Sequence, residues 1–157
     1  MSDVREAIMA RLLEIAAGVP TVANAYRNIK AVSDDKLPAL VVLEGEEEAD
    51  ETDPPRRVPQ STRRIHMRPQ ILIASGAPPE EIGTDLNTLR LATIDAVLHD
   101  DALRELTLDE TGVRYEGMDS ELQFGRSMIG NIALRFRLTY ALTVSYTHLT
   151  LPTILRV

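Results

Sequence analysis

The stretch NIALRFRLTYALTV, residues 131–144, decides the fold of this chain. Apolar and polar side chains alternate along it, and in a strand every second residue points to the same face. One face would carry the apolar set Ile132, Leu134, Phe136, Leu138, Tyr140, Leu142 and Val144. The other face would carry Arg135 and Arg137 among small and polar residues. This alternation predicts a long antiparallel strand that is buried on one side and solvated on the other.

A second stretch, TRRIHMRPQILIAS at residues 62–75, alternates in the same way. Its apolar face would hold Ile65, Met67, Ile71 and Ile73, and its polar face would hold Arg64, His66, Arg68 and Gln70. Pro69 lacks a main-chain donor, so we expect this strand either to lie at a sheet edge or to be bulged at Pro69.

The remaining elements follow from helical spacing and from turn residues. We expect helices over residues 3–17 and from Pro78 to about residue 100, because apolar residues recur there every three or four positions. Shorter strands are expected at 22–32, 38–44 and 111–122. The order α-β-β-β-α-β-β predicts an α/β (α+β) fold with two helices packed on one face of a mixed, largely antiparallel sheet.

Acidic charge is concentrated in one segment. The chain has 17 basic and 24 acidic residues and a net charge of −7. Residues 44–53, EGEEEADETD, hold seven acids and no base, so the other 17 acids balance the 17 bases and this segment carries the whole net charge. Three prolines and Arg56–Arg57 follow it. We therefore predict one domain over residues 1–144 with a mobile charged loop at 45–61.

The sequence offers no recognisable catalytic, cofactor or metal site. It has no cysteine and three scattered histidines, and it contains no HExxH, GxSxG, GxGxxG or P-loop pattern. The acids of residues 44–53 do not have the ligand spacing of an EF-hand. No apolar run approaches the roughly 20 residues that span a bilayer, and the N-terminus has no apolar signal region. We expect no enzymatic activity, no cofactor and no membrane partner.

Charged side chains are the better candidates for function. If the two alternating strands share a sheet, Arg64, Arg68, Arg135 and Arg137 lie on one basic surface. The acidic net charge and the lack of interleaved aromatics argue against specific nucleic-acid binding and favour an acidic protein surface, including residues 44–53 of a neighbouring copy. An ordinary solvated sheet face is the alternative. The candidate interface residues are Glu46, Glu47, Glu48, Asp50, Glu51, Arg56, Arg57, Arg64, Arg68, Arg135 and Arg137.

Four stretches carry a family resemblance: VREAIMARLLEIAAGVP at 4–20, LPALVVLEGEEE at 37–48, RPQILIASG at 68–76 and NIALRFRLTYALTV at 131–144. With them, residues 1–144 resemble the tail terminator, or minor tail, proteins of long-tailed bacteriophages (prophage-type tail completion proteins). The resemblance implies a non-enzymatic subunit of a ring, typically a hexamer, without a cofactor.

Such a ring caps the head-proximal end of the tail tube, ends tube polymerisation and prepares head joining. The implied partners are further copies of the chain, the tail tube protein and the head–tail connector. The implied location is the virion tail, with the host cytoplasm during assembly. Two alternatives stay open: a head–tail joining (neck adaptor) protein of the same region, and a small ligand-binding or enzymatic α+β domain.

The last residues, 145–157, have no clean periodicity. The string SYTHLTLPT within them resembles translated sequencing-adapter read-through. We expect the native chain to continue past Val144 with other residues, and we assign this tail no function.

Overall fold

The computed structural model describes residues 3–29, 31–51, 60–108, 112–123 and 129–145. Within these ranges the chain forms helices on one side of a five-stranded sheet, with a short 3₁₀ turn at Asp34–Lys36. The elements are α1 (Val4–Ala17), β1 (Asn24–Arg27), β2 (Ala39–Ala49), β3 (Gln60–Ser75), α2 (Pro79–Leu98), α3 (Asp101–Leu106), β4 (Val113–Gln123) and β5 (Ile129–Ser145).

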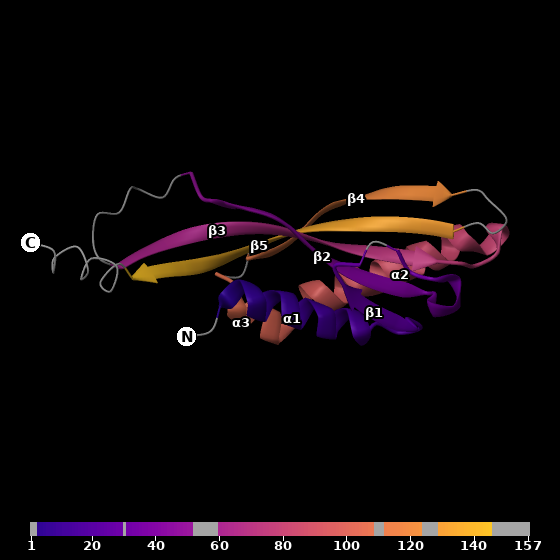
Figure 1. Cartoon of the computed structure of the whole chain (residues 1–157), viewed down its shortest axis with the longest axis horizontal. Coiled ribbons are helices and arrows are strands. Elements are labelled where there is room, and N and C mark those ends of the chain that lie inside the picture. The colour runs from indigo at the N-terminus through magenta and orange to yellow at the C-terminus, as the bar shows by residue number, and fades with distance from the viewer. Residues whose placement is uncertain (1–2, 30, 52–59, 109–111, 124–128, 146–157) are drawn as a thin grey trace, which may run out of the picture.

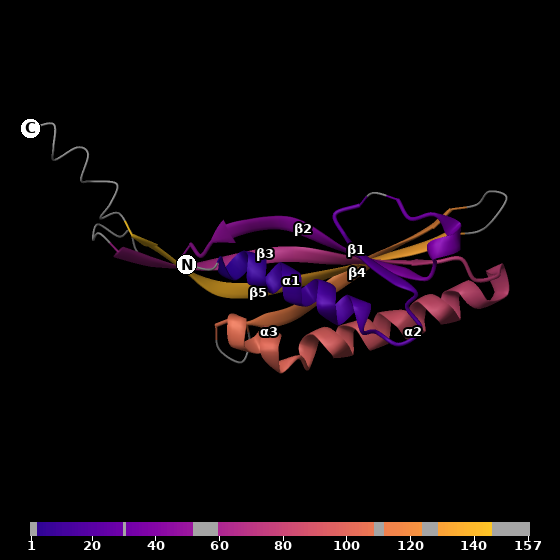
Figure 2. The same cartoon turned by 60° about the horizontal axis from the view of Figure 1, so that its bottom comes forward.

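The sheet has the strand order β1-β2-β3-β5-β4, in which β1 and β2 are parallel and all other neighbours are antiparallel (Figure 1). The helices lie together below the sheet in Figure 2, which leaves its other face open. The α+β class and the predicted order of elements are therefore confirmed. The short helix α3 is an addition, because Asp100 starts a new helix: its carboxylate accepts a hydrogen bond from the main-chain N–H of Leu103 at 2.8 Å.

The core lies between the sheet and the helices, and the two alternating strands supply much of it. Ile65, Met67, Ile71 and Ile73 of β3 are buried, as are Ile132, Leu134, Phe136, Leu138 and Tyr140 of β5. Phe136 is 0% exposed, and its ring centroid lies 5.7 Å from that of Tyr115 on β4. The predicted inward faces of both strands are thus confirmed at these positions.

Pro69 lies in the middle of the sheet and faces a bulge. Leu43 pairs with Gln70 and Glu46 pairs with Arg68, so two residues of β2 stand opposite the single Pro69. Of the two predicted alternatives, the edge strand is wrong and the bulge is confirmed. Gly45 makes the bulge possible, because its φ of 67° favours glycine and a Cβ there would lie 1.9 Å from the Arg68 carbonyl oxygen.

Two element boundaries differ from the prediction by more than two residues, and β3 begins at Gln60, so residues 60–61 of the predicted loop are strand as well. β2 continues to Ala49, so residues 45–49 are strand and not the beginning of a loop. The strand continues because Glu46, Glu47, Glu48 and Ala49 all pair in register with β3. β1 is shorter than predicted, because Asn28 adopts a φ of 58° and turns the chain away. Arg56, Arg57 and residues 146–157 lie outside the described ranges.

Candidate interaction surface

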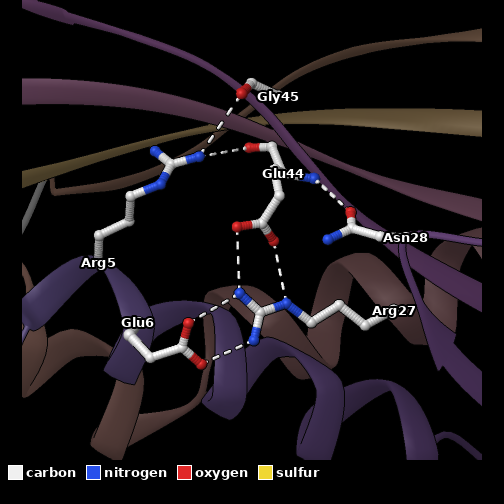
Figure 3. A network of polar contacts seen from close by, with 6 residues as sticks. All are labelled: Arg5, Glu6, Arg27, Asn28, Glu44 and Gly45. Carbon is white, nitrogen blue, oxygen red and sulfur yellow. Dashed lines mark hydrogen bonds and ion pairs between the residues drawn. The ribbon is translucent and has the colours of Figure 1, made fainter.

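The first acid of the charged segment, Glu44, belongs to a network that joins three elements (Figure 3). Arg27 of β1 donates to both oxygens of Glu44, at 3.0 and 3.1 Å, and to both oxygens of Glu6 on α1, at 2.7 and 3.0 Å. The main-chain N–H of Glu44 donates to the side chain of Asn28 at 3.2 Å. The hydrogen bonds from Arg27 lower the pKa of both carboxyl groups. This network holds β1 and β2 against α1.

Glu47 makes a second link between the sheet and the helices. Arg5 of α1 donates to a Glu47 carboxylate oxygen at 2.8 Å and to the main-chain carbonyl of Glu44 at 3.1 Å. The hydroxyl of Tyr140 donates to the same Glu47 oxygen at 2.9 Å. Burial, followed by this hydrogen bond, raises the pKa of Tyr140 to about 12. Glu47 therefore points to the helix side and stabilises the fold.

We call the sheet surface that the helices leave uncovered the open face. β3 and β5 are neighbours, and the pairing of Gln70 with Arg135 brings their polar faces together as predicted. On this surface Arg68 donates to Glu48 at 2.8 Å and lies 3.8 Å from Glu116. Glu116 also lies 3.9 Å from Arg137.

Arg68 and Arg137 on the open face are therefore paired within the subunit. Arg135 completes the set through a hydrogen bond and ion pair with Asp119 of β4. The sequence predicted a basic surface that would meet acids of a neighbouring copy. The structure instead forms a band of both charges, with arginines on the two central strands and acids from β2 and β4 on either side.

A hollow of about 230 Å³ lies between the bulge of β2 and a second bulge in β4. It is lined by Gly45, Glu46, Arg68, Gln70, Glu116 and Arg135. Two glutamates and two arginines balance the charge there, so the hollow has no net preference for an anion or a cation. Its charged side chains can hydrogen-bond to a protein surface.

His66 is held between two polar partners near one end of the open face. One ring nitrogen lies 2.9 Å from a carboxylate oxygen of Asp50, and the other lies 2.8 Å from the hydroxyl of Thr139. In the described part of the chain, no three histidine or acidic side chains converge as ligands for a metal ion. Across the same ranges, no helix has the length and apolarity to cross a membrane.

The remaining candidate residues do not form a single cluster. Arg64 lies on the same face of β3 as His66 and Arg68 and also interacts within the chain. Glu51 is exposed in the turn after β2, and Arg56 and Arg57 fall outside the described ranges. The sequence analysis missed Arg5 and Arg27, which hold Glu47 and Glu44 from segments far away in the chain. The adjacent Arg5 and Glu6 at the start of α1 were the available signal.

No family model matches this chain, and no curated protein matches its sequence. A chain in the virion of a native gene transfer agent particle has a TM-score of 0.50 at 18% identity, over 85% of this chain and 92% of that chain. The sheath/tube terminator structure of an extracellular contractile injection system, PVC, in the extended state, gives a TM-score of 0.39 at 8% identity, over 90% of this chain and 57% of that chain. The first likeness shows a shared fold, and the chain thus shares its fold with a component of a gene transfer agent virion.

Proposed function

We propose that this chain is a structural tail protein that forms a ring, typically of six copies, at the head-proximal end of a tail tube. The ring would end tube polymerisation and prepare the end for head joining. The observation that carries the proposal is the fold shared with a chain of the gene transfer agent virion, which covers nearly the whole length of both chains. The resemblance of residues 1–144 to tail terminators of long-tailed phages supports the same role.

The surface chemistry also supports a role in assembly. Glu48, Arg68, Glu116 and Arg137 form a chain of ion pairs across four strands of the open face, and the described side chains there do not converge on an activated nucleophile or acid–base pair. A sheet surface with paired charges and a small hollow can pack against other proteins. We therefore propose further copies of the chain, the tail tube protein and the head–tail connector as partners, in the virion tail.

Tube length tests this proposal directly. Purified tail tube protein from the same genome is polymerised with and without one ring equivalent of the chain per hundred tube subunits, and tube lengths are measured by electron microscopy. We expect shorter tubes with the chain present from the start and unchanged lengths when it is added after polymerisation. Equal lengths in every condition would contradict the proposal. Binding to connector rings without any effect on tube length would instead indicate a neck adaptor.

A further inference from the structure

The ends of the two longest strands project from the body of the molecule. The pairing of β2 with β3 ends at Ala49 and Ile65, and the pairing of β4 with β5 ends at Val113 and Leu138. Residues 60–64 and 141–145 continue as a ribbon in which the two strands pair with each other. Both views show β3 and β5 running past the end of α1 (Figures 1 and 2). We call this ribbon the arm.

The arm continues the apolar stripe of β5 beyond the helices that cover it. Leu142 points to the same face as Leu138 and Tyr140, because the side chains of a strand alternate. Tyr140 is only 2% exposed, whereas Leu142 is 36% exposed. A two-stranded ribbon is at best marginally stable alone. The arm therefore gains stability if another surface covers Leu142.

The outer side of α2 presents a matching surface. Leu91 is 61% exposed, more than any other large apolar side chain in the described ranges. Exposed acids on the same helix include Glu80, Glu81 and Asp95, whereas Arg90 lies over the ring of Tyr115, with its guanidinium carbon 5.6 Å from the ring centroid. Asp95 lies about one turn from Leu91, and Glu80 and Glu81 lie about three turns away toward the start of α2.

Charge makes the arm complementary to α2. Arg63 pairs with Leu142 across the arm and shares its face, whereas Arg64 lies on the open face, and the described side chains of the arm include no acid. Both arginines also interact within the chain, but a guanidinium has five N–H donors and can serve a second partner. The face of the arm that carries Leu142 and Arg63 therefore has its complement in the side of α2 that carries Leu91 and Asp95.

We propose that the arm of one copy docks on the outer side of α2 in the next copy, with Leu142 against Leu91. The two surfaces differ, so the contact is head-to-tail, and repeating it closes a ring if the rotation permits. The arm and Leu91 are separate sites on one subunit, because the arm projects beyond the helices whereas Leu91 lies in the second half of α2, and each copy can therefore contact two neighbours. The ring itself rests on the proposed function, and this inference names the contact that builds it.

The absence of cysteine makes a direct test possible. The double variant Leu91→Cys/Leu142→Cys is oxidised and run on a non-reducing gel. We expect a ladder of linked subunits that ends at the size of the ring, since each copy links to the next. Each single variant alone should give no ladder. The matched control, Asp101→Cys/Leu142→Cys, uses the exposed Asp101 of α3, whose side chain is 91% exposed, and should also give no ladder.

The outcomes separate this inference from the proposed function. If light scattering detects a ring but no ladder forms, the proposed docking is wrong, whereas the proposed ring is still supported. A ladder from protein that does not shorten tubes would support the docking and contradict the capping function. Links that form only after tail tube protein is added would overturn the docking as the contact that builds the free ring, because the contact would then depend on the tube. A monomer without a ladder would overturn both.

A second variant covers the case in which the cysteine pair disturbs folding. Leu142→Asp in the otherwise unchanged chain should reduce the mass of the oligomer to that of the monomer while the melting temperature of the subunit stays the same. A full-sized oligomer of Leu142→Asp would overturn the inference.

Discussion

Gly45 is the residue on which the course of the charged strand depends. Gly45 is one of the two bulge residues opposite Pro69, and its φ is 67°. The Arg68 carbonyl oxygen occupies the space that a side chain at this position would need. Without the bulge, the alternation of β2 would shift by one residue past this point, and Glu47 would leave Arg5 and Tyr140. One glycine thus decides which acids face the helices and which face solvent.

Gly45→Ala should destabilise the chain strongly. The left-handed backbone alone costs about 1–3 kcal/mol for a residue with a side chain, and the contact with the Arg68 carbonyl adds to it. Gly83→Ala is the matched control, because this glycine lies in α2 with nothing within 4 Å of an added Cβ. Because alanine has a higher helix propensity than glycine, Gly83→Ala should raise the free energy of unfolding by up to about 1 kcal/mol. Urea unfolding of both variants checks this, and equal midpoints would contradict the account of the bulge.

Glu44 should make the stability depend on pH in the acid range. Arg27 lowers its pKa from the ordinary value of 4.5, so the unfolded chain binds the proton first as pH falls. The stabilisation is complete above about pH 5 and is lost as the pH falls through the folded pKa. Glu44→Gln should cost about 1 kcal/mol or less at neutral pH and should weaken the loss of stability below pH 4. Exposed Glu105 supplies the control for the loss of one charge, and Glu105→Gln should change the stability at neutral pH by no more than about 0.5 kcal/mol.

At the scale of elements, the core strand β5 supports the fold and its Phe136 is the clearest test. This side chain is fully buried between the sheet and the helices and contacts Tyr115. Phe136→Ala should lower the free energy of unfolding by about 3–5 kcal/mol. Leu142→Ala on the same face of the same strand should cost far less in the monomer, because Leu142 is partly exposed. Thermal unfolding of the two variants measures the difference, and similar losses would show that the buried face was assigned wrongly.

The elements differ in how well the sequence predicted them. Strict alternation in β3 and β5 was enough to predict the strands and their buried faces. Apolar residues at every second position can all be buried only if the segment is a strand with that face toward the core. Residues 45–49 misled the prediction, because a run of acids favours a solvated loop when its partners are unknown. The partners of Glu47 and Glu48, which are Arg5, Tyr140 and Arg68, come from three other segments and are brought close by the fold alone. The same holds for the charge pairing of the open face.

At the scale of the whole molecule, the assembly should respond to salt. The arm and α2 carry opposite charges at their proposed contact, and exposed charges are screened as the Debye length falls from about 10 Å at 0.1 M to about 3 Å at 1 M salt. Light scattering across this range should show that the protein concentration at which the oligomer dissociates rises as salt increases. An oligomer that strengthens with salt would instead indicate a contact dominated by apolar surface.

The central claim is that the chain caps one end of a tail tube. Chain carrying a gold label is mixed with growing tubes of the tail tube protein, and the position of each label is scored by electron microscopy. The account predicts label at a single end of each tube, with no further growth from that end. Label spread along the tubes, at both ends equally, or absent from them would contradict it.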